Sequence, residues 1–85
     1  ASYSVTITGS ATQAGPLGDM LVEHLEAQSL PVAELDVEER GEGRVDIVAT
    51  LVSTNVPSRE LDDIVDHLAT VHGIAHATWQ ARTHD

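Results

Sequence analysis

The chain has 85 residues, the size of one small domain with a single hydrophobic core. Its 14 acidic side chains outnumber four basic ones, and the net charge of −10 repels phosphate backbones, so we expect no nucleic-acid partner. The chain has no cysteine, which excludes disulfides, thiolate metal sites and cysteine nucleophiles.

The first two elements are predicted from a change in hydrophobic period. Apolar and polar residues alternate from Tyr3 to Thr8, which is typical of a strand with one buried face. Pro16 suits a first helical turn, and the apolar residues after it recur at helical spacing. We therefore expect a strand over Tyr3–Thr8 and a helix from Pro16 to about Ser29.

A hairpin is predicted next. Beyond Pro31, alternate residues are expected on opposite faces of a second strand: Ala33, Leu35 and Val37 on one, and Glu34, Asp36 and Glu38 on the other. The triplet Gly41–Gly43 permits the positive φ angles of a tight turn, so the next strand should be an antiparallel neighbour. This third strand is expected over Val45–Thr54, with a core face made of Val45, Ile47, Ala49 and Leu51.

The last two elements repeat the strand and helix pattern. Pro57 and Ser58 are expected to open a helix with one apolar stripe, made of Leu61, Ile64, Val65 and Leu68. Gly73 suits a C′ cap of that helix. A final strand is expected over Ile74–Arg82, with a core face made of Ala75, Ala77, Trp79 and Ala81. In this pattern Trp79 serves as a core anchor.

Two strand–helix–strand units with short connections predict an α+β fold of βαββαβ order. Right-handed crossovers place both helices on one face of a four-stranded antiparallel sheet. The expected fold is therefore ferredoxin-like, with strand order 4-1-3-2.

Two groups of residues raise the possibility of a metal site. Glu34, Asp36 and Glu38 share a strand face with Asp46 nearby, but residues spaced by two along a strand point in parallel rather than converging. The alternative is that these charges keep an edge strand soluble. The chain also has five histidines, and one of them, His67, lies four residues after Asp63 on one helix, a spacing that is common by chance. We therefore assign no metal.

The sequence favours a non-enzymatic domain without a cofactor. No motif presents a nucleophile beside a base, and the loop from Thr8 to Gly18 lacks the spacing and the lysine of a phosphate-binding loop. The aromatic residues Tyr3 and Trp79 share the core-facing phase, so they are not expected to stack RNA bases.

An interaction surface is predicted on the other face of the third strand. Val48 and Val52 leave that face partly apolar around Thr50, and we expect Val48, Thr50 and Val52 to contact a protein partner. Pairing through this face or through an edge strand would produce a homodimer.

The βαββαβ order, together with one group of residues near the C-terminus, resembles an ACT-like domain. More narrowly, it is similar to the C-terminal cytoplasmic domain of the MgtC/SapB family, in which a helix leads through Gly and Val or Ile into a strand bearing Trp. The resemblance covers Tyr3 to Arg82 and is carried by Leu68, Val71, Gly73, Ile74, Ala77 and Trp79. The arginine-only, alanine-rich and valine-rich composition fits an actinobacterium.

The resemblance implies a regulatory or protein-interaction domain on the cytoplasmic side of the bacterial inner membrane. Its parent would be a multi-pass membrane protein involved in adaptation to low magnesium and in intracellular survival, a virulence function. Protein partners, including membrane-embedded ones, are implied. The chain begins with Ala1 and has no signal-peptide pattern, so we expect residues 1–85 to be one domain excised from the C-terminus of that parent.

The resemblance also implies an alternative function. ACT domains bind amino acids or other small ligands in the loop after the first strand, often at a dimer interface. In this chain Gly9, Ser10, Gly15 and Gly18 would contribute to such a site. A small-ligand or metal-sensing ACT domain is therefore the second hypothesis.

Overall fold

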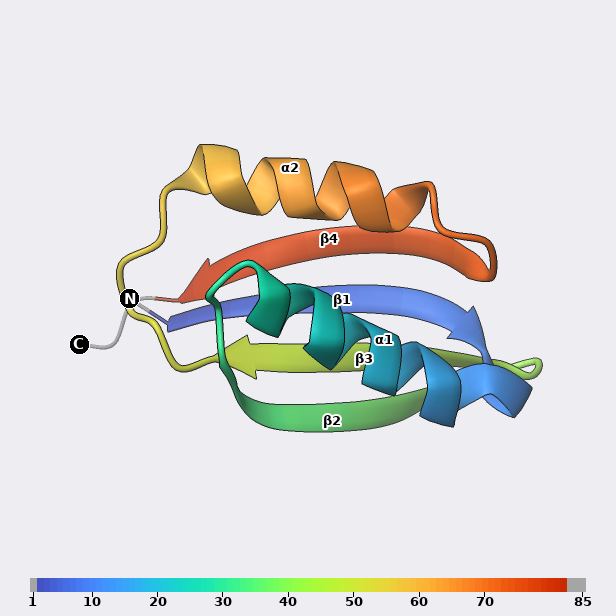
Figure 1. The fold of residues 1–85 in the computed structure, drawn as a ribbon. Coiled ribbons are helices and arrows are strands. Elements are labelled where there is room, and N and C mark those ends of the chain that lie inside the picture. Colours follow the sequence, from blue (N-terminus) through green and yellow to red (C-terminus); the bar gives the residue numbers. More distant parts are fainter. Residues whose placement is uncertain (1, 83–85) are drawn as a thin grey trace.

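The computed structural model describes residues 2–82 as four strands, two α-helices and one 3₁₀ turn (Figure 1). In chain order the elements are β1 (Ser2–Ser10), η1 (Ala11–Gln13), α1 (Ala14–Ala27), β2 (Val32–Gly41), β3 (Arg44–Leu51), α2 (Ser58–Ala69) and β4 (Ile74–Arg82). This order confirms the predicted βαββαβ pattern. No helix in the described residues is long and apolar enough to cross a membrane.

The four strands form one antiparallel sheet in the order β2-β3-β1-β4. This is the predicted order 4-1-3-2, counted from the other edge. Figure 1 shows α1 crossing the sheet near β1 and β3, whereas α2 runs beside β4. Side chains of both helices join one core cluster with alternate residues of β1 and β3, so both helices cover the same face.

The core is built from the predicted apolar faces. Alternation along β1 and β3 sends every second side chain toward the helices, and the stripes of α1 and α2 cover them. Seven large side chains in this core are fully buried: Val5, Ile7, Leu21, Leu25, Ile47, Leu61 and Leu68. The helices therefore leave the opposite face of the sheet uncovered.

Several predicted boundaries differ from the structure, three of them for a visible reason. The first helix begins at Ala14 rather than Pro16, because η1 leads directly into it. The third strand ends at Leu51 rather than Thr54, and the Val52 N–H donates to the Pro31 carbonyl instead of continuing the ladder. Gly73 is not the C′ cap, because α2 ends at Ala69; its φ of +98° belongs to the turn that enters β4.

The predicted core face of β4 is only partly correct. His76 pairs with Thr8 and Ile74 pairs with Gly9, so Ala75 is an extra residue in a β-bulge. The bulge reverses the alternation, and Ala75 is exposed while Ile74 is buried.

Trp79 packs against the core but is only half-buried, because β4 is an edge strand. Its ring centroid lies 6.5 Å from that of Tyr3, and its indole N–H donates to Asp62 Oδ1 at 2.7 Å. The tryptophan therefore packs at the edge of the core, between β4 and α2, rather than at its centre.

The predicted hairpin joins β2 and β3 through a two-residue turn. Gly41 pairs with Arg44, and the central residues Glu42 and Gly43 have φ angles of +56° and +75°. Positive φ at both central positions is what a type I′ turn requires. Glu42 is unusual there, because the left-handed region is unfavourable for residues other than Gly, Asn and Asp.

Replacing Glu42 by Asn should therefore raise the free energy of unfolding by about 0.5–1 kcal/mol, because Asn tolerates the left-handed region better. Urea unfolding followed by circular dichroism measures the change. Glu39→Asn is the matched control, since it removes the same charge from an exposed position in β2. Equal gains in both variants would show that net charge, rather than the turn, is responsible.

Candidate functional site

The face of the sheet turned away from the helices carries a regular set of polar side chains. The strand register arranges them in three rows, each crossing β2, β3, β1 and β4. The rows consist of Glu34, Thr50, Ser4 and Gln80; Asp36, Val48, Thr6 and Thr78; and Glu38, Asp46, Thr8 and His76. These twelve residues, called the open face below, line a shallow hollow of about 780 Å³.

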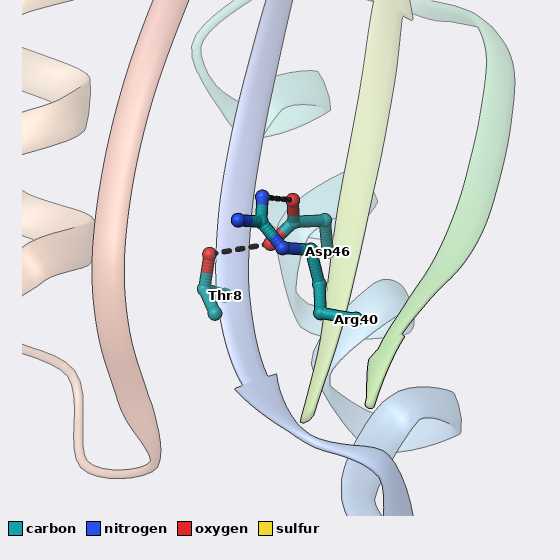
Figure 2. A network of polar contacts seen from close by, with 3 residues as sticks. All are labelled: Thr8, Arg40 and Asp46. Atoms are coloured by element: carbon teal, nitrogen blue, oxygen red, sulfur yellow. Dashed lines mark hydrogen bonds and ion pairs between the residues drawn. The ribbon is translucent and has the colours of Figure 1, made fainter. Parts of the chain in front are cut away.

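Asp46 is the most constrained residue of the open face, with only 7% of its surface exposed. Thr8 Oγ1 donates to Asp46 Oδ1 at 2.6 Å, and Arg40 Nη1 donates to Asp46 Oδ2 at 2.7 Å (Figure 2). A register shift between Glu39 and Gly41 leaves Arg40 out of the regular ladder of β2 and β3. Its side chain extends over β3 and contacts Asp46 of that strand. Both oxygens of the carboxylate are thus occupied.

These contacts stabilise the charged form of Asp46. The hydrogen bonds from Thr8 and then from Arg40 hold the pKa of the carboxyl below its ordinary value, against the opposing effect of burial. A carboxyl whose pKa is lowered by folding stabilises the native state above its unfolded pKa. That contribution is lost as the pH falls through the folded pKa.

The carboxylates of the open face do not converge on one point. Glu34, Asp36 and Glu38 lie in three different rows, and Asp46 is already paired with Arg40. Among residues 2–82, no group of three or more His, Asp or Glu side chains is placed to hold a metal ion. The face offers hydroxyl and carboxylate groups for hydrogen bonding and for attracting cations on a partner.

The predicted interaction residues are only partly together. Val48 and Thr50 are half-buried and line the hollow of the open face. Val52 lies just beyond the end of β3, is 56% exposed and is not part of that lining. Partner binding by these residues stays a prediction.

The four residues of the predicted ligand loop lie in different settings. A Cβ at Gly9 would come within 2.5 Å of Leu17 Cδ1, so this glycine permits close packing. Ser10 caps η1, its hydroxyl oxygen accepting from the Thr12 N–H at 3.3 Å. Gly15 and Gly18 both lie in α1, where Gly15 is exposed and Gly18 is buried. Ligand binding by this group stays a prediction.

A second hollow, of about 310 Å³, lies between the two helices. The His24 and His67 rings stack across it, with centroids 4.8 Å apart and planes within 6°. Burial, and secondarily the nearby His67, lowers the pKa of His24. Asp63 lines the same hollow as His67, as their spacing suggested. Of the five histidines in the chain, His84 lies outside the described residues.

The Asp46 network was missed by the sequence analysis. The hairpin register already placed Asp46 beside the carboxylates of β2, and the strand order placed β1 on its other side. Those two facts together point to a partner such as Thr8. Arg40 had no comparable signal, because its position depends on the register shift near the hairpin turn.

Comparison with known families gives one match that covers most of the chain. A family model described as the MGTC/SAPB C-terminal domain matches residues 3–79. A search of curated protein sequences finds no significant match.

Solved structures agree on the fold. The C-terminal domain of the MgtC protein from Mycobacterium tuberculosis is 17% identical with a TM-score of 0.77, the match covering 98% of this chain and 88% of that one. The ACT domain of GTP pyrophosphokinase from Chlorobium tepidum is 11% identical with a TM-score of 0.65, covering 93% and 96%. A formyltetrahydrofolate deformylase from Pseudomonas putida KT2440 is 16% identical with a TM-score of 0.69, covering 99% of this chain but 30% of that one. The fold is thus the ferredoxin-like fold of ACT domains.

The packing at Gly9 leads to a stability prediction. Gly9→Ala should lower the free energy of unfolding by about 1–3 kcal/mol, because the new methyl would overlap Leu17 and approach the Gly73 carbonyl oxygen at 3.0 Å. Gly15→Ala is the control: no atom lies within 4 Å of its added Cβ, and alanine favours the helix by up to about 1 kcal/mol. Thermal unfolding of both variants measures the contrast. If Gly9→Ala is as stable as the wild type, packing does not require this glycine.

The Asp46 network leads to a prediction about pH. Thr8→Val should raise the pKa of Asp46 toward its ordinary value and lower the free energy of unfolding at neutral pH by about 1 kcal/mol. The stability difference should shrink as the pH falls from the ordinary aspartate pKa of about 4 through the lower pKa of the wild-type carboxyl, below which Asp46 is protonated in both proteins.

Carboxyl titration by NMR and urea unfolding at several pH values check both parts. The control is Thr6→Val, which changes a threonine in the adjoining row of the same face that donates nothing to Asp46. A similar pKa rise in the control would contradict the assigned role of Thr8.

Proposed function

The chain belongs to the MGTC/SAPB C-terminal domain family, and on this basis we propose that it is a cytoplasmic, protein-binding regulatory domain. Its parent would be an MgtC-like protein of the bacterial inner membrane, with residues 1–85 forming one C-terminal domain. The parent would act in adaptation to low magnesium and in intracellular survival, which contributes to virulence. The domain would work by binding and not by catalysis.

The observation that carries this proposal is the open face. Among the described residues, both helices pack on the opposite face, which leaves twelve side chains in three ordered rows free to contact a partner. Thr8 and Arg40 hold Asp46 in place in the third of these rows, so that part of the face is rigid before binding. A partly apolar centre at Val48 with polar surroundings resembles the arrangement of a protein interface.

The nature of the partner follows from charge. A domain with a net charge of −10 favours proteins with basic surfaces, membrane-embedded ones included, over nucleic acid. A second copy of the chain is a weaker candidate, because it carries the same charge.

The second candidate function is that of a small-ligand or metal sensor, favoured by the likeness to the ACT domain of GTP pyrophosphokinase. Its site would be the segment that carries Gly9, Ser10, Gly15 and Gly18. Shifts of the Gly9–Gly18 amide signals on addition of an amino acid would support this function. Shifts confined to the open face on addition of a protein partner would support the first.

The proposal is tested in the full-length parent protein at low magnesium. Val48→Arg should abolish the ability of the parent protein to restore growth and reduce the recovery of cross-linked partners about tenfold, because it replaces the apolar centre of the face with a cation that repels a basic partner. The matched control is Val22→Arg, which adds the same charge at a half-buried valine on α1. Neither valine belongs to the core or packs against it. Normal growth and partner recovery with Val48→Arg, at equal protein level, would refute the proposal for this face.

A further inference from the structure

The strand β2 forms an edge of the sheet that no other described strand covers. It pairs with β3 alone, and all its residues after Val32 are exposed. Figure 1 shows it along the outer border of the sheet. Between Glu34 and Glu39 its register against β3 is unbroken, so this six-residue stretch is regular enough to template another strand. Every second residue of such an edge directs its backbone N–H and C=O outward.

The two faces of this edge differ in chemistry. On the helix side, Leu35 and Val37 lie opposite Ala49 and Ile47 but remain 38% and 52% exposed. They are two of the three exposed large hydrophobic residues in the described part of the chain. A strand that needed only to stay soluble would gain nothing by exposing them, whereas a strand that receives a partner would bury them.

The open side of the same edge is acidic. Glu34, Asp36 and Glu38 project from successive rows, and the neighbouring Arg40 is engaged by Asp46. Antiparallel pairing with a second copy, centred on Asp36, would place Asp36 against Asp36 and Glu34 against Glu38. Like charges directly opposite each other destabilise a strand pair, so this edge disfavours self-association.

We propose that the β2 edge binds an extended segment of another protein as a fifth strand, in which Lys or Arg alternates with aliphatic residues. The basic side chains lie against Glu34, Asp36 and Glu38, and the aliphatic ones cover Leu35 and Val37. Main-chain hydrogen bonds supply affinity, and the alternating pattern supplies register and specificity. This inference deepens the proposed protein-binding function by naming the edge used and the partner's chemistry.

A charge-reversed copy of the chain serves as a probe with this pattern. In the variant E34K/D36K/E38K, β2 carries three lysines alternating with Leu35 and Val37. When it is mixed with the wild-type chain, sedimentation velocity should show a one-to-one heterodimer, while each protein alone stays monomeric. Hydrogen exchange should slow at the β2 amides of both chains.

The charge-matched control is D19K/E23K/E26K, which reverses three exposed carboxylates on α1. It should bind the wild-type chain about tenfold more weakly than the β2 variant, because its lysines are not beside an unpaired strand edge. Equal binding by the two variants, or protection away from β2, would overturn the inference. So would the absence of a heterodimer when circular dichroism shows that both proteins are folded.

A peptide probe covers the case in which the β2 variant does not fold. A peptide of alternating lysine and valine should shift the wild-type β2 amide signals, while a peptide of the same composition with its lysines grouped should bind about tenfold more weakly. Equal binding of both peptides would also overturn the inference. Normal growth and partner recovery with Val48→Arg, with edge binding intact, would refute only the proposed use of the open face.

Discussion

The rest of the structure depends on the burial of one face of a four-stranded sheet against two helices. Residues 2–82 form one core, and side chains from both helices contribute to it. Because alternate residues of a strand point to opposite faces, the same pairing that fixes the core also fixes the rows of polar residues on the other side. A one-residue slip of β3 would place Val48 in the core and expose Ile47.

Most of the fold could be predicted from hydrophobic period alone, because the core faces of β1 and β3 and the stripe of α2 are regular. The failures occurred where regular pairing is interrupted. Strict alternation along β4 predicts that Ala75 is in the core. A β-bulge reverses the alternation at this residue, and the pattern of apolar residues does not reveal the bulge. The size of Trp79 predicts a central anchor, but its burial depends on the edge position of β4 and on a hydrogen bond to Asp62.

The candidate site was predictable to the extent that it follows from register. The placement of Glu34, Asp36 and Glu38 on one face of β2, and that of Val48 on the face opposite the core, were both correctly predicted. The attachment of Arg40 to Asp46 was not, because a long side chain displaced by an irregular pairing has no sequence signature. Gly9, near the end of β1, illustrates the reverse: its packing role becomes visible only when Leu17 and the carbonyl of Gly73 are placed beside it.

The central position of β1 also governs the order in which the sheet can assemble. Ser2 pairs with Arg82, so the contact between β1 and β4 closes a loop that spans nearly the whole described chain. Closing so long a loop costs more conformational entropy than forming the hairpin of β2 and β3, whose partners are close in sequence. The hairpin can therefore form early, while β1 completes the sheet late and joins its two halves into one cooperative folding unit.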